Sequence, residues 1–189
     1  MKPDGIFPLT QERWEDFEEL FGPRGACAGC WCMYWKRRRK DYNSGKGDGN
    51  WGEQRAFVFS GQVPGLLANK GGVPAGWVAV EPRESFPVLR NSRILQPVDG
   101  QPVWSVPCFF VAKRYRGQGL TVAILQAAIQ YVAEQGGHVL EGYPVEPGEG
   151  TLAVPTFVYT GLASAFRQAG FVEVARRSPK RPIMRYVLP

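Results

Sequence analysis

The segment that decides the fold is VAKRYRGQGLT, which runs from Val111 to Thr121. The apolar run PVWSVPCFFVA leads into it, and the run that follows, residues 120–135, is apolar around most of a helical circumference. These patterns predict a strand and a buried helix, joined by a basic turn that contains two glycines. Glycine lets a backbone approach a ligand closely, and a helix N-terminus offers free N–H groups and a positive dipole end. The turn therefore predicts a site for a pyrophosphate.

The rest of the chain alternates between helical and strand patterns. Apolar spacing predicts a helix over residues 11–21 that is capped by Thr10, and a capping pattern at Asn50 and Glu53 predicts a second helix that ends near residue 61. A glycine turn joins two strands in a hairpin over residues 65–81, and Pro107 predicts a bulge or an edge in the strand at 102–112. The remaining elements follow in order: short helical turns at 82–92, a helix at 120–135, a strand at 138–145, a helix at 161–171, and strands at 171–176 and 183–188. This order predicts a mixed α/β sheet with helices on its faces.

Length and composition favour a single folded unit. The chain has 189 residues, of which 44% are hydrophobic, enough to bury a core. We therefore expect one domain over residues 1–189, with a Cys/Trp-rich segment and a basic, glycine-rich loop inside it at residues 24–50.

The sequence also suggests a compartment. No window reaches the roughly 18 consecutive apolar residues of a membrane span, and the start, MKPDGIFPLT, lacks the apolar run of a signal peptide. Three of the four cysteines lie within six residues, unlike the spread framework of a small secreted protein, so reduced thiols are expected. We expect a cytoplasmic protein that does not bind a membrane.

The net charge of +6 suits an anionic partner without naming it. Its densest source is the block from Lys36 to Lys40, KRRRK, which leads into the glycine-rich stretch DYNSGKGDGN. We interpret the block as the solvated flank of a mobile loop. Steering of an acidic ligand is the first alternative, and nucleic-acid binding is less favoured because no recognisable motif surrounds the block.

The turn that opened this section resembles the acetyl-CoA loop of the GCN5-related N-acetyltransferase (GNAT) family. That loop has arginine or glutamine, two residues, glycine, one residue, and then glycine or alanine. Arg116 to Thr121 match it with one departure, Thr121; a second register, Arg114 to Gly119, also fits, but the first places Val111 at the strand end as in the family. The flanks PLTQERWEDFEELF, GLLANKGGVPAGWVAV and YTGLASAFRQAGFVEV resemble the family's other elements in the same order.

The resemblance implies a fold and an activity. The GNAT fold is a mixed, mostly antiparallel sheet of six to seven strands, with helices on both faces and with strands four and five splayed apart. The implied activity is N-acyltransfer, with acetyl-CoA as the donor, to an amine of a small molecule or peptide that attacks directly in a ternary complex. A metal and a nucleic-acid partner are not expected, and a homodimer is allowed for.

The resemblance also assigns residues to the donor. Phe109, Phe110 and Val111 would hold the pantetheine arm, and the N–H of Phe110 or Val111 would stabilise the developing oxyanion. The pyrophosphate cradle would comprise Arg116, Gly117, Gln118, Gly119, Leu120 and Thr121.

The acid and base are less directly assigned. Many family members have a tyrosine four residues before the glycine of the last helix, where this chain has Phe166, which has no proton to give. Tyr159 is a substitute acid, against the simpler interpretation of a buried core tyrosine. Glu81 and Glu141 are candidate bases that act through water, although each could be a solvated carboxylate. We interpret the single histidine, His138, as structural.

The segment GACAGCWCMYW, residues 25–35, leaves several interpretations open. Cys27, Cys30 and Cys32 with Cys108 could bind zinc. Cys27 and Cys30 could act as a redox dithiol, or Cys32 or Cys108 could carry an acyl group. We favour packing: in an extended segment, Cys30, Cys32 and Tyr34 would face one way and Trp31, Met33 and Trp35 the other. With Trp77, Trp104 and Tyr143 this segment would wall a pocket for an apolar or ring-bearing amine.

Two functions from other classes remain as alternatives. The missing tyrosine at residue 166 is compatible with a non-catalytic CoA-binding or regulatory protein on the same fold, and the cysteines with a metal or redox protein. The sequence does not name the acceptor.

Overall fold

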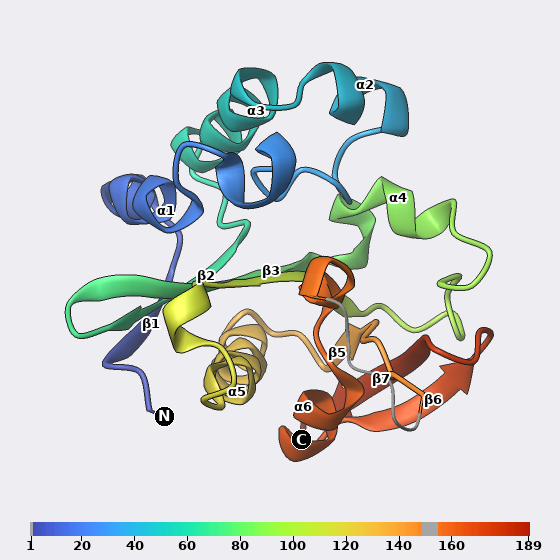
Figure 1. Cartoon of the computed structure of the whole chain (residues 1–189). Coiled ribbons are helices and arrows are strands. Elements are labelled where there is room, and N and C mark those ends of the chain that lie inside the picture. The colour runs from blue at the N-terminus through green and yellow to red at the C-terminus, as the bar shows by residue number, and fades with distance from the viewer. Residues whose placement is uncertain (1, 149–154) are drawn as a thin grey trace.

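A computed structural model describes residues 2–148 and 155–189 of the chain. Its helices and strands alternate as the sequence predicts, and they lie in layers (Figure 1). The strands are β1 (Gly5–Pro8), β2 (Gly65–Lys70), β3 (Val73–Pro82), β4 (Trp104–Val111), β5 (Val139–Gly142), β6 (Val172–Arg176) and β7 (Pro182–Val187). The helices are α1 (Trp14–Phe21), α2 (Arg39–Ser44), α3 (Asp48–Phe59), α4 (Pro87–Arg90), α5 (Leu120–Glu134) and α6 (Ala163–Gln168), with short 3-10 turns at Gln11–Arg13, Arg83–Ser85, Lys113–Tyr115 and Pro155–Thr160.

The seven strands form one sheet in the order β1-β2-β3-β4-β5-β7-β6. Every neighbouring pair is antiparallel except β4 and β5, which are parallel. Parallel neighbours need a crossover connection, and α5 supplies it between β4 and β5. The predicted mixed, mostly antiparallel sheet is confirmed.

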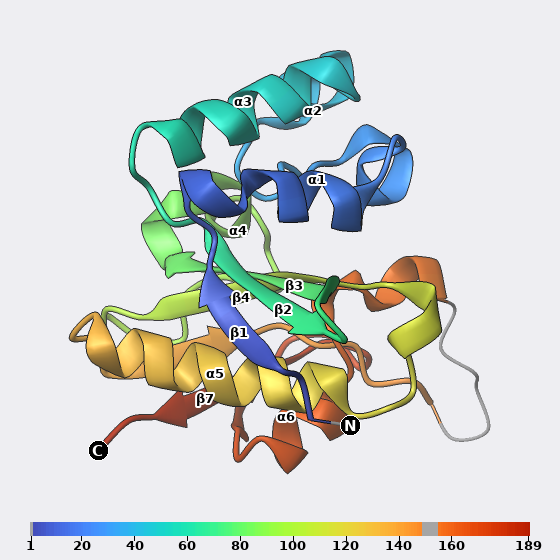
Figure 2. The ribbon, with the colours of Figure 1, turned by 90° about the vertical axis from the view of Figure 1, so that its left-hand side faces the viewer.

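Helices cover both faces of this sheet (Figure 2). Helices α5 and α6 lie on one face, whose core includes Ile124, Leu125 and Phe166. The opposite face carries α1 and α4, with α2 and α3 stacked farther out, and its core includes Phe17, Trp77 and Tyr143. We call this second face the α1 face. On α5, Gln126 and Gln130 are exposed as the apolar pattern predicts.

Pro107 shapes the strand that carries the candidate site. Ala79 pairs with Cys108 and Glu81 pairs with Ser105, so two steps along β3 match three along β4. The extra residue is a β-bulge in β4 at residues 106–107, as predicted from a proline that cannot donate to a ladder.

The segment from residue 24 to residue 50 differs from its prediction. The supposed glycine-rich loop contains helix α2, and α3 begins at Asp48, so Asn50 lies inside its first turn. Asn50 is fully buried and donates to the carbonyls of Gly29 and Tyr42, so it ties the cysteine segment to the helices instead of capping one. Thr10 does stand at the N-terminus of the first helical turn, but its side chain makes no capping bond.

Candidate active site

The centre of the sheet contains a fork between β4 and β5. The two strands pair only from Trp104 to Val106, opposite Leu140 to Gly142, and β4 then continues to Val111 without β5 beside it. The predicted splay of the fourth and fifth strands is therefore present, and it opens directly after the bulge at Pro107.

The β3–β4 ladder fixes which backbone groups face this fork. Ala112 donates its N–H to the carbonyl of Ala75 at 3.0 Å, and Phe110 pairs with Trp77. Because alternate residues of an antiparallel strand point to opposite sides, the N–H of Phe110 points to β3, while those of Phe109 and Val111 point into the fork. Within the described residues, no acceptor is found for the N–H of Phe109 or for that of Val111. The sequence offers the N–H of Phe110 or of Val111 as the oxyanion donor. Because the Phe110 N–H faces β3, only the Val111 N–H remains a candidate.

The glycine turn lies at the open end of the fork. Gly117 and Gly119 have φ values of 71° and 80°, a left-handed conformation that side chains disfavour, and Gly119 immediately precedes α5. Among the described residues no side chain caps this helix, whose first N–H groups have no partner within the helix itself. The side chain of Arg116 donates from Nε to the carbonyl of Val111 at 2.9 Å, and so links the turn to the fork. The turn has the features of an anion site.

Phe166 occupies the inner end of the fork on the α5 side. It is fully buried, its ring lies edge-on to Phe109 at 5.9 Å between centroids, and a Cβ on Gly142 would come within 2.0 Å of it. The ring therefore fills the contact between the last paired residue of β5 and the first free stretch of β4. It contributes packing there and no proton donor.

On the α1 face, Cys108 of β4 lies beside Cys32. The indole of Trp77 donates to the sulfur of Cys32 at 3.1 Å. The neighbouring Cys108, followed by Trp77, lowers the pKa of Cys32. The interaction with Cys32, followed by burial, raises the pKa of Cys108 well above the usual thiol value. The pair is a buried contact between the cysteine segment and the fork strand.

The cysteine segment itself is not extended, so the predicted alternation of its side chains is wrong. Ala26, Ala28, Trp31 and Cys32 have positive φ values, and the chain turns repeatedly between residues 25 and 36. As a result, Trp31, Cys32, Met33 and Trp35 are all buried, with Trp31 stacked on Phe21. These side chains therefore pack in the core, which is the favoured interpretation, but they do not alternate between the two faces of an extended strand.

Two other residues of the predicted aromatic pocket are also buried. Trp77 and Tyr143 are fully buried, so they cannot wall an open pocket. Cys30 is half-buried, its pKa raised by burial and by Cys32. Tyr34 is half-buried and lies edge-on to Tyr159, with 5.9 Å between ring centroids. Trp104 packs on the other face, against Tyr131.

Tyr159 belongs to the 3-10 turn before α6 and packs beside β4 on the α1 face. The pKa of the Tyr159 phenol is raised, chiefly by burial and in second place by the neighbouring Tyr34. The hydroxyl thus remains protonated over the whole physiological range.

Glu81 is buried at the end of β3 and forms an ion pair with Lys36. The side chains are 9% and 5% exposed respectively, so the first residue of the basic block is not a solvated flank as predicted. Burial raises the pKa of Glu81, and Lys36 opposes that effect. Glu81 lies two residues along β3 from Ala79, which pairs with Cys108, so the ion pair stands on the strand next to the Cys32–Cys108 contact.

Glu141 is fully buried in a different setting. One carboxylate oxygen accepts from Arg83 at 2.9 Å and from the Tyr143 hydroxyl at 2.7 Å, and the other accepts from Arg185 at 2.8 Å. Asp99 completes the network from the far side of Arg185. Both oxygens are thus occupied by buried donors, so the geometry favours a structural role for Glu141 over the predicted base.

Sequence reasoning missed the partners of these carboxylates. Lys36 belongs to the basic block interpreted as solvated, and Arg83 and Arg185 give no signal, because a lone basic residue in a pattern is usually solvated. The described residues contain no cluster of three or more histidine, cysteine or acidic side chains that could hold a metal ion. No helix in residues 2–148 or 155–189 is long and apolar enough to cross a membrane.

Comparisons with known proteins agree with this fold. The model of the acetyltransferase (GNAT) family matches residues 10–149, about three quarters of the chain, and the chain therefore belongs to that family. No curated protein gives a significant sequence match.

Solved structures show the same fold at low sequence identity. A GNAT-family acetyltransferase from Streptococcus pneumoniae is 15% identical with a TM-score of 0.56, and the alignment covers 98% of this chain and 99% of the other. The acetyltransferase yncA from Salmonella typhimurium, solved with its cofactor acetyl-CoA, is 15% identical with a TM-score of 0.52, over 98% and 94% of the two chains. The PaiA N-acetyltransferase from Thermoplasma acidophilum, solved with coenzyme A, is 13% identical with a TM-score of 0.53, over 97% and 98%.

Proposed function

We propose that the protein is an acyl-CoA-dependent N-acyltransferase that transfers acetyl from acetyl-CoA to an amine by direct attack in a ternary complex. The observation that carries the proposal is the fork, where two backbone N–H groups of β4 lack a strand partner next to a helix N-terminus without a side-chain cap. Acetyl-CoA would supply a thioester whose acyl carbon is already activated. The structures solved with acetyl-CoA and coenzyme A bound support this choice of donor.

The residues that would hold the donor lie on one continuous stretch of chain. The backbones of Phe109 and Val111 would bind the pantetheine arm, with Phe110 supporting them from the β3 side. Arg116 to Thr121 would bind the pyrophosphate through backbone N–H groups. The N–H of Val111 would donate to the oxygen on which charge develops, the kind of contact that contributes most in acyl transfer.

Glu81 is the proposed base. An ammonium acceptor must lose a proton before it attacks, and a carboxylate whose pKa is raised toward neutrality is the better acceptor of that proton. Glu81 would act through water, and Lys36 would hold it in place. Glu141 does not enter this proposal, because Arg83 and Arg185 occupy it.

Tyr159 is the proposed hydrogen-bond donor to the leaving thiolate. Its raised pKa lies above that of a thiol, about 8.5, so full proton transfer to the thiolate would be uphill. Tyr159 would therefore stabilise the thiolate by donating a hydrogen bond.

A cytoplasmic location and a homodimer remain predictions.

A second function has one observation in its favour. Phe166 fills the place at the fork where many family members have a proton-donating tyrosine, which is compatible with a non-catalytic protein that binds CoA.

Two measurements separate these functions. Calorimetric titration with acetyl-CoA should give binding with one site per chain, and no binding at millimolar donor would exclude both. Release of free thiol from acetyl-CoA in the presence of a panel of amines should exceed the amine-free rate. Donor binding with no amine-dependent release would favour the non-catalytic alternative.

A further inference from the structure

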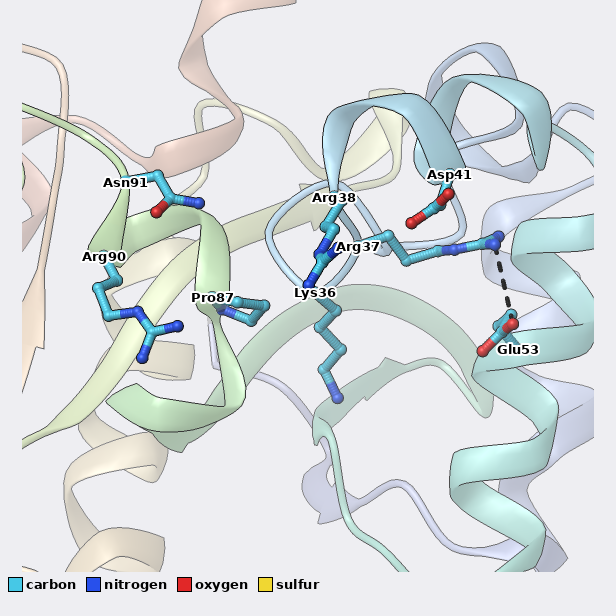
Figure 3. Close-up of a pocket in the computed structure, with 8 residues that line it drawn as sticks. All are labelled: Lys36, Arg37, Arg38, Asp41, Glu53, Pro87, Arg90 and Asn91. Carbon is cyan, nitrogen blue, oxygen red and sulfur yellow. Dashed lines mark ion pairs between the residues drawn. The ribbon is translucent and has the colours of Figure 1, made fainter.

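A pocket of about 660 Å³ opens on the α1 face, between the segment that leads into α2, helix α3 and helix α4 (Figure 3). Four cations line it, Lys36, Arg37, Arg38 and Arg90, against two carboxylates, Asp41 and Glu53. A volume of this size suits a small molecule or the end of a peptide. The lining carries a net positive charge, which is unusual for a pocket that would admit an ammonium group.

The four cations differ in whether their side chains already have a partner. Lys36 is paired with Glu81, and Arg37 donates to Asn50 at 2.9 Å and lies 3.8 Å from Glu53. Arg38 and Arg90 have neither an ion pair nor a hydrogen bond from their side chains to any described residue. Figure 3 shows Arg90 on the α4 side of the pocket, with Arg37 and Glu53 on the opposite side and Lys36 between them. Two guanidinium groups are therefore available to a ligand.

The pocket is connected to the proposed base. Lys36 belongs both to the lining and to the buried pair with Glu81, and Glu81 lies two residues along β3 from Ala79, the partner of Cys108 in the fork strand. A ligand in the pocket would thus touch Lys36, which is paired with Glu81, the group proposed to take the proton from the amine.

We propose that Arg38 and Arg90 bind an oxyanion at one end of the acceptor, and that the acceptor is an amine with a carboxylate group. This inference rests on the proposed acyltransfer and specifies its substrate class. Guanidinium groups suit carboxylates because two N–H groups donate in parallel to two oxygens, and such charge-assisted bonds are strong. The pocket then replaces the predicted site for an apolar or ring-bearing amine, whose walls Trp77 and Tyr143 are fully buried.

The test compares amines that differ only in charge at the far end. The acids β-alanine and γ-aminobutyrate are titrated into CoA-saturated protein by calorimetry beside their amides, and phosphoethanolamine is titrated beside ethanolamine. Each carboxylate should bind at least about tenfold more tightly than its amide. A preference confined to phosphoethanolamine would overturn the carboxylate assignment, and equal binding within every pair would overturn the pocket itself.

Variants locate the effect. Arg38→Gln and Arg90→Gln should each weaken binding of the acids by about tenfold and leave the amides unchanged. Arg93→Gln is the matched control, since Arg93 is an exposed arginine just beyond α4 that does not line the pocket. If all three variants bind the acids alike, the assignment to Arg38 and Arg90 is wrong.

The same titrations distinguish this inference from the proposed function. The amines are also titrated without CoA, so loss of acetyl-CoA binding would refute acyltransfer while the preference for acids could still be measured. Normal donor binding and thiol release with no preference for acids would refute only the pocket.

Discussion

The indole N–H of Trp77 donates to the sulfur of Cys32 at 3.1 Å, which fastens the cysteine segment to the third strand. Cys32→Ala should leave this fully buried N–H without an acceptor and lower the free energy of unfolding by about 1–3 kcal/mol. Cys32→Ser, which keeps an acceptor, should cost less, and Cys27→Ala at an exposed position should cost almost nothing. Urea unfolding measures all three; equal losses for Ala and Ser would mean that the bond does not matter.

The buried carboxylate of Glu141 gives a larger expected effect. Glu141→Gln should lower the free energy of unfolding by about 3–5 kcal/mol, because buried Arg83 would lose the charge that compensates its own, while Arg185 would keep only Asp99. Glu146→Gln, which removes a surface carboxylate paired with Arg167 and Arg176, should cost at most about 1 kcal/mol. Similar losses in the two variants would contradict the structural role of Glu141.

The glycine turn can be tested through donor affinity. Gly119→Glu should weaken acetyl-CoA binding by at least about tenfold, since a carboxylate at the helix N-terminus would repel the pyrophosphate. Gly119→Ala introduces the same left-handed strain at φ 80° without the charge, and should weaken binding less. Calorimetry measures the affinity and thermal unfolding checks that both variants fold. Unchanged affinity for the glutamate variant would mean that the turn does not bind the donor.

Glu81 should determine the acid side of the pH profile. Its carboxyl must be ionised to accept a proton, so kcat/KM should rise with pH through a pKa above the usual value of about 4.3. Glu81→Gln should lower kcat by about 100-fold and remove this limb, whereas the exposed Glu84→Gln should keep both. Thiol release from pH 5 to pH 9 measures the profile. An unchanged limb in Glu81→Gln would assign the base to another group.

The same raised pKa affects stability. A carboxyl with a raised pKa in the folded state contributes its full stabilisation below its unfolded pKa, and this contribution is lost as pH rises through the folded value. Relative to Glu81→Gln, which has no carboxyl at this position, the wild type should therefore lose stability between about pH 4.3 and the pKa of Glu81, whereas Glu84→Gln should follow the wild type; urea unfolding across this pH range measures the difference.

Tyr159 should matter moderately. Tyr159→Phe removes only the hydroxyl that would donate to the thiolate, and kcat should fall by about tenfold or less because a thiolate can leave without an acid. The KM for acetyl-CoA should stay the same. Tyr131→Phe, on the other face of the sheet against Trp104, is the control and should keep the wild-type kcat. Equal rates for both variants would leave thiolate departure to water.

Much of the fold could be predicted because its signals are local. The alternating hairpin at residues 65–81, the apolar stripe from Leu120 to Glu134 and the proline in β4 each specify a structure from neighbouring residues alone. The glycine turn belongs to the same class, since φ values of 71° and 80° require the residue type that the sequence shows.

The acceptor side could not be predicted because it depends on contacts between distant segments. Trp31 and Cys32 adopt left-handed conformations that nothing in their own residue types favours, and tertiary packing against Phe21 and Trp77 holds them there. Lys36 is likewise buried only because Glu81, 45 residues later, meets it. Sequence spacing contains neither fact.

The short pairing between β4 and β5 has a thermodynamic consequence. Only three residue pairs join the four-strand half of the sheet, β1 to β4, to the half formed by β5, β7 and β6. A ligand that accepts from Phe109 and Val111 in the fork would take the place of the absent partner strand, and its binding energy would add to the cohesion of the two halves. If the proposed donor binds there, binding and unfolding are coupled, and a higher concentration of acetyl-CoA should raise the melting temperature of the protein.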